Sequence, residues 1–235
     1  MHLELEHGRF QRRYKRFFAD VERSDGSVVV SHLPNTGSMA TLLHNNVDAF
    51  IRFDGNPKRK LQWTLTLMGT TDGGLALVDT ALPNGIVEEG ILAGDVPELS
   101  GYEGLRREVR YGEQNSRIDI LLEGERGPCY VEVKNCTMAS ATVDGRADFP
   151  DSRTTRGLKH LEELTTLVKN GIRAVQFYLV SRTDCNSFGI AAEIDPDYAA
   201  AARVAEKAGV EFLSYRVDLK PDEVGVGSRC PLSLT

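Results

Sequence analysis

Two acidic residues and a lysine near the middle of the chain have the types and spacing of a metal-dependent hydrolytic site. Asp119 lies in the run Ser-Arg-Ile-Asp-Ile-Leu-Leu, and Glu132 and Lys134 lie in Cys-Tyr-Val-Glu-Val-Lys after a short polar segment. The two runs predict a β-hairpin with its polar side chains on one face and its valines facing a core. If the turn is centred between Glu125 and Arg126, Asp119 lies directly opposite Glu132, with Cβ atoms about 5 Å apart.

Two carboxylates this close repel each other, so the pairing is expected only where a cation lies between them. Oxygen ligands favour a hard divalent ion, so the expected cofactor is Mg2+ or Mn2+. Lys134 is placed to stabilise a developing anion or to orient a water nucleophile. The alternative is an ordinary solvated sheet face with a Glu-Lys pair, and a turn shifted by one residue would separate the two acids.

The composition is that of a soluble globular protein, with 235 residues of which 41% are hydrophobic and 26% charged. This length allows one large domain or two small ones with a buried core. Apolar runs fall short of the roughly 20 residues that span a bilayer, and the N-terminus is charged, unlike a signal peptide. The four cysteines are scattered, which disfavours a zinc site or a disulfide framework. We therefore expect a cytoplasmic protein with reduced thiols and no membrane partner.

The net charge of −6 is unevenly divided along the chain. Residues 1–84 carry 10 Lys/Arg and 9 Asp/Glu, whereas residues 85–235 carry 18 and 25. In the first part, basic residues lie among aromatic ones or in one short run, a composition that suits a surface binding phosphates and bases. These candidates are Arg12, Arg13, Lys15, Arg16, Lys58, Arg59 and Lys60. The alternative is a solvated basic strand edge over an aromatic core.

Turn residues divide the first part of the chain into short β-like runs. The predicted strands are Phe10–Val21, Ser27–His32, Val47–Phe53, Leu61–Thr70 and Leu75–Val78. Short strands at this spacing predict a small barrel or sandwich. A five-stranded oligonucleotide-binding (OB) barrel matches the size, although other small β folds share the pattern.

After residue 84 the pattern becomes mixed α/β. The predicted elements are a helix at Ile86–Gly94, strands at Leu105–Tyr111, Ile118–Leu122 and Tyr130–Lys134, a helix at Thr155–Lys169, a strand at Ala174–Val180, a helix at Tyr198–Ala208 and a strand at Glu211–Val217. The sequence therefore predicts two domains, residues 1–84 and 85–235, in an α/β (mixed α+β) fold class. Residues after 221 are expected to be loose.

The spacing Asp119-x12-Glu132-x-Lys134, in this order of elements, resembles the PD-(D/E)xK nuclease superfamily, although Ile118 replaces the proline of its name. Longer blocks over nearly the full chain resemble the bacterial and archaeal sugar fermentation stimulation protein family. These blocks are Arg12–Phe17, Pro34–Met39, Asn56–Leu61, Ser116–Asp119, Val131–Asn135, Phe149–Asp151 and Thr155–Leu161. The resemblance implies an OB barrel followed by a PD-(D/E)xK restriction-endonuclease-like domain. It also implies DNA binding with little sequence preference.

Given the resemblance, Asp119 and Glu132 are expected to hold one or two divalent ions, with the Val133 carbonyl as a third oxygen ligand. Lys134 is expected to position the attacking water or to stabilise the phosphate. Glu98 precedes the first core strand, near the place where many of these nucleases supply a further carboxylate. The alternative for Glu98 is an ordinary helix-end or loop carboxylate.

Arg156, Lys159 and His160 lie at the start of the second predicted helix, where the helix dipole disfavours cations. Their position predicts an anionic partner, for which phosphate is the obvious candidate. The alternative for His160 is a structural histidine with satisfied hydrogen bonds. Asn35 and Thr36 lie in a turn whose backbone N–H groups could bind phosphate, or which only closes a hairpin.

Three functions are compatible with these features. The first is a metal-dependent nuclease that cleaves DNA or RNA phosphodiesters with little sequence preference. The second is a non-catalytic DNA-binding regulator that influences sugar (maltose) metabolism, and the third is a protein-interaction module suggested by the acidic second domain. The paired carboxylates favour the enzyme. Strand preference and oligomeric state stay open, with a homodimer as one option.

Overall fold

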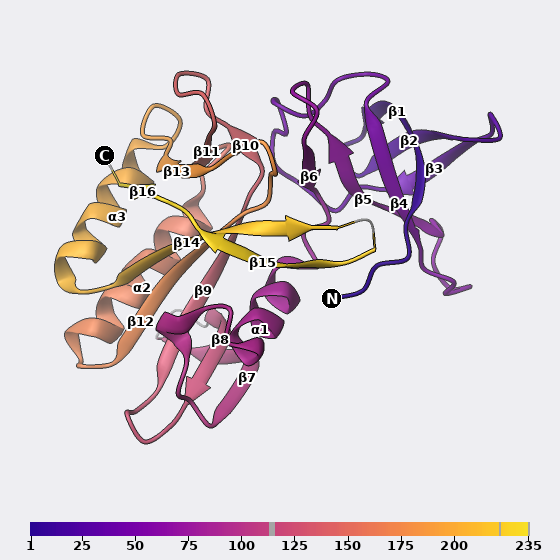
Figure 1. The fold of residues 1–235 in the computed structure, drawn as a ribbon. Coiled ribbons are helices and arrows are strands. Elements are labelled where there is room, and N and C mark those ends of the chain that lie inside the picture. Colours follow the sequence, from indigo (N-terminus) through magenta and orange to yellow (C-terminus); the bar gives the residue numbers. More distant parts are fainter. Residues whose placement is uncertain (113–115, 221, 235) are drawn as a thin grey trace.

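The computed structural model describes residues 1–112, 116–220 and 222–234, which form two domains in contact (Figure 1). The strands of the first domain are β1 (Glu6–Tyr14), β2 (Phe18–Arg23), β3 (Val28–His32), β4 (Asp48–Phe53), β5 (Trp63–Gly69) and β6 (Leu75–Leu77). They pair in the order β3-β2-β1-β4-β5-β6, and β3 also pairs with β5. This extra pairing closes β1 to β5 into a five-stranded barrel around a buried apolar core.

One predicted strand of the barrel is wrong. The run Phe10–Val21 is a hairpin of β1 and β2, because the chain turns at Lys15 and Arg16. Both residues have positive φ angles, 47° and 65°, a conformation usually taken by glycine or asparagine. Without either residue type at the turn, the local sequence gives no signal for it.

The second domain is built on a six-stranded sheet with the order β15-β14-β12-β9-β8-β7. Its elements are α1 (Pro83–Ala93), a 3₁₀ turn η1 (Pro97–Leu99), β7 (Gly104–Tyr111), β8 (Ser116–Glu123), β9 (Cys129–Cys136), β10 (Met138–Ala139), β11 (Arg146–Phe149), α2 (Thr155–Lys169), β12 (Arg173–Val180), β13 (Ser187–Ile190), α3 (Pro196–Ala208), β14 (Glu211–Leu219), β15 (Val224–Arg229) and β16 (Leu232–Ser233). Strand β12 runs parallel to both β9 and β14, whereas β7, β8 and β9 form an antiparallel meander. Strands β10, β11, β13 and β16 form a small second sheet.

Helices cover both faces of the large sheet (Figure 1). Helix α1 packs on one face and α2 and α3 pack on the other, so the sheet separates two apolar cores. The side chain of Thr154 caps α2 by accepting a hydrogen bond from the backbone N–H of Gly157, and Leu161 and Leu164 turn one apolar face to the sheet. The bounds of α2 are those predicted from its apolar spacing.

The two domains share a core and backbone hydrogen bonds. Leu67 and Leu77 of the barrel pack in the core on the α1 side, together with Leu3 of the N-terminal segment. The backbone N–H of Leu77 donates to the carbonyl of Ser181 at 2.9 Å. The predicted boundary after residue 84 lies inside the first turn of α1, so the barrel strands end before it.

The residues after 221 are not a loose tail. Strand β15 pairs with β14, and its buried Val224 and Val226 pack against α1, where Gly90 leaves room for Val226. The sequence nevertheless gives the overall fold class correctly, a small barrel followed by a mixed α/β domain. No helix in the described part of the chain is both long and apolar enough to cross a membrane.

Candidate active site

The predicted register of the β8–β9 hairpin is confirmed. Ile120 pairs with Val131, which places Asp119 and Glu132 at the next position, where the recorded pairing of the two strands ends. There the Oδ2 atom of Asp119 accepts a hydrogen bond from the backbone N–H of Val133 at 2.7 Å. Because the N–H and C=O of one residue in an extended strand point to the same side, the Val133 carbonyl also points toward β8. The Asp119 carboxylate thus points toward the backbone of β9 at Val133.

The backbone of the neighbouring strand β7 is irregular at this point. Glu108 has a φ angle of +55°, and the pairs recorded on either side of it join Arg107 to Ile120 and Val109 to Ile118. Ile118 and Ile120 lie in the cores on opposite faces of the sheet, although residues two apart normally face the same way. The strand is therefore rotated at the position between them, which is that of Asp119. Such distortions are unfavourable by about 1–3 kcal/mol and concentrate at functional sites.

Asp119 is largely enclosed, and its carboxylate is held by two donors. Besides the Val133 N–H, the side-chain amide of Asn84, at the start of α1, donates to Oδ1 at 2.8 Å. Burial, and then the negative charge of Glu132, raise the pKa of Asp119 to about 6, against the opposing effect of the Val133 hydrogen bond. The two carboxylates are therefore electrostatically coupled, as the hairpin register predicted.

Glu132 is almost fully buried, and its two oxygens have different surroundings. Oε1 accepts a hydrogen bond from Lys134 Nζ at 2.6 Å and lies in very short contact with Nδ1 of His160. Oε2 is buried without any partner among the described residues. Burial acts to raise the pKa of Glu132, but the charge of Lys134 and the hydrogen bond from His160 outweigh it, so this pKa lies below its ordinary value. The structure keeps Glu132 ionised with one oxygen available.

His160 does not lie on the protein surface, where it was expected to contact phosphate. Its side chain is only 5% exposed, and its ring is fixed between Glu132 and Arg156, whose Nε faces the ring Nε2 at 3.4 Å. Nδ1 faces the carboxylate of Glu132, which only accepts, and Nε2 faces Arg156, which only donates, so we assign the ring proton to Nδ1. Lys134 Nζ also lies 3.2 Å from Nδ1. The prediction of a phosphate ligand is therefore corrected. The histidine positions the carboxylate.

The oxygen atoms of Asp119, Glu132 and Val133 that could bind a metal suit a hard divalent ion. They are carboxylate oxygens, one of them unpartnered and buried, with the Val133 carbonyl pointing to the same strand edge. Within residues 1–112, 116–220 and 222–234, no three acidic, imidazole or thiol side chains form a metal-binding group. An ion held by this pair would thus keep waters or phosphate oxygens among its ligands, as Mg2+ usually does.

Glu98 is not part of this pair. Its carboxylate accepts a hydrogen bond from the Tyr215 hydroxyl at 2.5 Å and lies 2.7 Å from Arg229 Nη1, so β14 and β15 occupy both of its oxygens. The predicted role of Glu98 as a metal ligand is therefore wrong. Asn84, which the sequence analysis did not select, is the residue from α1 that contacts Asp119.

A basic groove adjoins the acidic pair at the start of α2. Its volume is about 600 Å³. It is lined by Glu108, Ser116, Arg117, Thr155, Arg156, Lys159 and His160. Arg156 and Lys159 therefore lie together, as predicted, and the structure adds the exposed Arg117 from β8. Its isolated position in a strand gave no reason to select it from the sequence.

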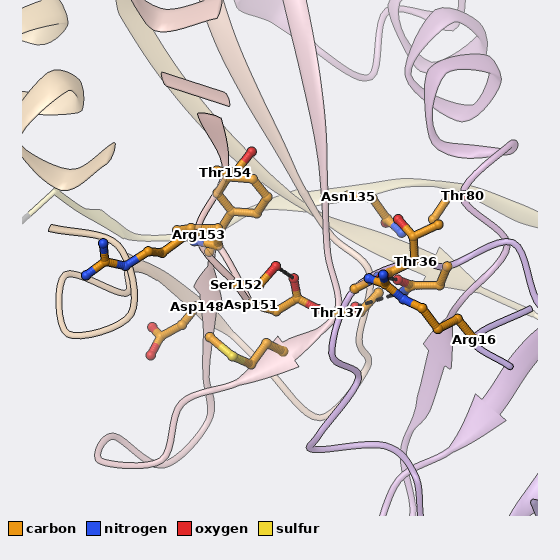
Figure 2. A pocket seen from close by; sticks show the side chains of 15 residues that line it. Arg16, Thr36, Thr80, Asn135, Thr137, Asp148, Asp151, Ser152, Arg153 and Thr154 are labelled. Atoms are coloured by element: carbon orange, nitrogen blue, oxygen red, sulfur yellow. Dashed lines mark hydrogen bonds between the residues drawn. The ribbon is translucent and has the colours of Figure 1, made fainter. Parts of the chain in front are cut away.

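A second, smaller cavity of about 280 Å³ lies between the two domains. Figure 2 shows Arg16 and Thr36 of the barrel on one side of it, with Asp151 and Ser152 in the middle and Arg153 on the other side. The cavity also reaches Asn135 and Thr154, which directly follow Lys134 and precede α2. The acidic pair thus lies close to both cavities.

Several predicted nucleic-acid contacts in the barrel have structural partners. Arg13 donates to the carbonyls of Asn35, Gly37 and Ser38, and Arg16 donates to the carbonyl of Thr36 at 2.8 Å. These arginines shape the loop at 35–38, with Asn35 buried within it. Its Oδ1 accepts from the Gly37 N–H, which closes an Asx turn.

The remaining basic residues of the barrel divide into paired and exposed ones. Arg12 lies 2.7 Å from Asp20, and Arg59 pairs closely with Asp54. Lys15, Lys58 and Lys60 are exposed, and the side chain of Arg12 is 71% exposed in spite of its ion pair. Lys15 lies in the β1–β2 turn, whereas the other two lie between β4 and β5, so the structure places the two predicted basic clusters on separate loops.

Family profiles match both domains of the chain. The N-terminal OB domain of SfsA matches residues 12–78, and the RE domain of the sugar fermentation stimulation protein matches residues 81–223. The chain belongs to the sugar fermentation stimulation protein family. The resemblance seen in the sequence is therefore confirmed, and the barrel is an OB domain.

Relatives match over nearly their full length. A sugar fermentation stimulation protein homolog of Shewanella sp. (strain MR-4) is 45% identical over 229 residues, 97% of each chain. A homolog from Shewanella baltica (strain OS155) is 46% identical over 227 residues, 96% of each chain. The structure of Pyrococcus furiosus SfsA in complex with Ca2+ superposes with a TM-score of 0.88 and 26% identity, covering 99% of this chain and 98% of that one.

Proposed function

We propose that this protein is a divalent-metal-dependent nuclease that hydrolyses phosphodiester bonds of DNA, with RNA as a second candidate substrate. Asp119, Glu132 and Lys134 form its catalytic set. The observation that carries the proposal is the buried and unpartnered Oε2 of Glu132, beside an aspartate whose pKa is raised to about 6. Buried carboxylate oxygens without partners are rare, and a bound cation would satisfy this one.

Mg2+ or Mn2+ is the proposed ion, held by Asp119, Glu132 and the Val133 carbonyl. The relative from Pyrococcus furiosus was solved with Ca2+, which is also a hard cation with oxygen ligands. When bound, such an ion polarises phosphate oxygens and lowers the pKa of water. These donors provide carboxylate and carbonyl oxygens, so the residues fit the ion.

Lys134 and His160 have different proposed roles at the site. Lys134 Nζ donates to Glu132 and also lies 3.2 Å from Nδ1 of His160, and a further N–H of its three can bind a phosphate oxygen or a water. The His160 ring, on helix α2, holds Oε1 of Glu132 on β9 and leaves Oε2 without a hydrogen-bond partner. This arrangement orients the carboxylate before any substrate binds.

The nucleic acid is proposed to bind across the OB domain and the basic groove. Arg117 and Arg156 are exposed in that groove, next to the catalytic set. OB domains commonly bind oligonucleotides without strong sequence preference, and Lys15, Lys58 and Lys60 offer further charges for phosphates. Shared hydrogen bonds between the domains hold both surfaces in one arrangement.

The test is cleavage by the pure protein of single-stranded DNA, double-stranded DNA and RNA, each with Mg2+, Mn2+ or a chelator. Asp119→Asn should abolish cleavage and Lys134→Gln should lower it by about 100-fold or more, whereas Lys169→Gln, at the exposed end of α2, should leave it unchanged. Equal cleavage by all four proteins would show a contaminating enzyme. Metal-independent binding without cleavage on any substrate would overturn the proposal.

A non-catalytic DNA-binding regulator of sugar metabolism is the second candidate. It is favoured by the lack of a third acidic ligand at the pair among the described residues. It would use the same OB domain and groove but would not need an ion. For either candidate we propose a cytoplasmic location, which the free thiols of all four cysteines support.

A further inference from the structure

Buried polar atoms without hydrogen-bond partners gather around Glu132. In the described part of the chain, eight buried side-chain nitrogen or oxygen atoms lack a partner. Six of them are Tyr111 Oη, Ser116 Oγ, Glu132 Oε2, Glu163 Oε1, Glu163 Oε2 and Gln176 Oε1. Because such atoms are rare and usually scattered, this concentration calls for a missing ligand.

The residues that carry these atoms are neighbours in the fold. Tyr111 pairs with Ser116 across β7 and β8, and Gln176 of β12 pairs with Glu132 and donates to its carbonyl at 3.0 Å. Glu163 follows His160 by one helical turn on α2, so the two side chains share a face. Since His160 contacts Glu132, the carboxylate of Glu163 lies on the same side of the sheet as the Glu132 side chain.

The Tyr111 hydroxyl marks the space between the carboxylates. A Cβ built on Gly112 would lie 2.5 Å from Oε1 of Glu163, so this carboxylate packs against the residue next to Tyr111. The pKa of Tyr111 is raised well above its ordinary value by burial and then by the charges of Glu132, Glu163 and Asp119. The Tyr111 ring also packs against Tyr130, which precedes Glu132 by two residues on β9, with ring centroids 5.6 Å apart.

A buried carboxylate with neither oxygen hydrogen-bonded is strongly unfavourable unless a cation compensates it. Glu163 is 5% exposed, and no lysine, arginine or histidine of the described residues forms an ion pair with it. A water molecule would supply hydrogen bonds but no charge. The available donors are carboxylate and hydroxyl oxygens, which suit a hard divalent ion.

We propose that Glu163 and the Oε2 atom of Glu132 bind a second divalent cation, with the hydroxyls of Tyr111 and Ser116 as further oxygen ligands. The inference rests on the proposed function for the first ion, at Asp119, and adds a ligand from α2 whose two oxygens have no hydrogen-bond partner among the described residues. Because Lys134 and His160 hold Oε1 of Glu132, its Oε2 atom would then be shared by both ions. The helix that positions the catalytic carboxylate through His160 also supplies a ligand of its own.

The experiment is calorimetric titration of the metal-free full-length protein with Mn2+ alone, without nucleic acid. The wild type should bind two ions, Glu163→Gln should bind one, and Asp119→Asn should retain one. Glu162→Gln is the matched control, because Glu162 is the adjacent but exposed residue of the same helix, and it should bind two ions. Equal ion numbers and affinities in Glu163→Gln and Glu162→Gln would overturn the inference.

A second variant guards against a folding defect in Glu163→Gln. Tyr111→Phe keeps the aromatic ring against Tyr130, at a centroid distance of 5.6 Å, and removes only the hydroxyl. It should weaken one of the two Mn2+ sites by about tenfold, as the loss of a supporting ligand does. Two unchanged sites in this variant would contradict the inference.

The outcomes separate this inference from the proposed function. A single Mn2+ that is lost in Asp119→Asn and unaffected in Glu163→Gln would remove the second site only. No Mn2+ binding by the wild type would remove both. Two ions together with no cleavage of any substrate would support the second site and remove the nuclease.

Discussion

Replacing Asp119 by asparagine should stabilise the metal-free protein at neutral and alkaline pH. Burial and the charge of Glu132 raise the pKa of Asp119 from 3.8 to about 6 in the folded state. Below pH 3.8 the carboxyl is protonated in both the folded and the unfolded protein, so its burial does not lower the free energy of unfolding. As the pH rises toward 6, the unfolded chain loses the proton first, and the folded state loses stability.

The size of this loss follows from the two pKa values. Each unit corresponds to about 1.4 kcal/mol, so the shift to about 6 amounts to about 3 kcal/mol above pH 6. Asparagine avoids this penalty. Its carbonyl can keep the hydrogen bond from Val133, and the Asn84 amide can rotate to accept from the new amide group. Because amide hydrogen bonds are weaker than those to a carboxylate, we expect a net gain of about 2 kcal/mol, or about 4–8 °C in Tm.

The assay is thermal denaturation in chelator from pH 4 to 9. The difference in Tm between Asp119→Asn and wild type should grow between about pH 4 and 6 and stay constant at higher pH. The exposed Asp144, replaced by asparagine, is the control and should show no such difference. Adding Mg2+ at 100 times its Kd should then stabilise the wild type by about 2.7 kcal/mol and the variant much less. A variant less stable than wild type at pH 8 in chelator, or a difference that does not depend on pH, would refute this reasoning.

Three other substitutions test separate parts of the site. Lys134→Gln should lower single-turnover cleavage by about 100-fold or more and leave Mn2+ binding intact, and cleavage at the wild-type rate would contradict its role. His160→Ala should remove one hydrogen-bond donor from Oε1 of Glu132. The pH optimum of activity should therefore move to higher pH, and the free energy of unfolding should fall by about 1–3 kcal/mol. An unchanged pH profile would refute this. Joint replacement of Arg117 and Arg156 by glutamine should reduce the slope of log K against log salt for single-stranded DNA by about 1.4, measured by fluorescence anisotropy. An unchanged slope would remove the groove from the binding surface.

The parts of this structure that the sequence predicts are those defined by local periodicity. The alternation of apolar and polar residues in β8 and β9, with a turn centred between Glu125 and Arg126, gave the register that pairs Ile120 with Val131, one position before Asp119 and Glu132. The apolar spacing of α2 gave its bounds, because its core face and its Thr154 cap are both local features. The blocks shared with the family added the OB barrel, which short strands alone do not distinguish from other β folds.

What the sequence did not predict depends on contacts between distant segments. Asn84 reaches Asp119 only because α1 packs across β8, and Glu98 is drawn to Tyr215 of β14 instead. Glu163 has no feature in the sequence that separates it from the neighbouring Glu162, and its burial against Gly112 appears only in three dimensions. Strands as short as β10, β11 and β16 carry no clear alternation, so their small sheet was missed.

The acidic pair is tolerated without an ion because the structure treats its two members differently. Glu132 is kept charged by Lys134 and His160, whereas Asp119 has only neutral donors and takes up a proton below about pH 6. The repulsion is thus relieved by one proton at a defined carboxyl. A divalent ion must displace that proton, so proton and ion compete for the same oxygens. For the proposed ion, the asymmetry that stabilises the empty pair would therefore also make Asp119 the residue at which pH controls binding.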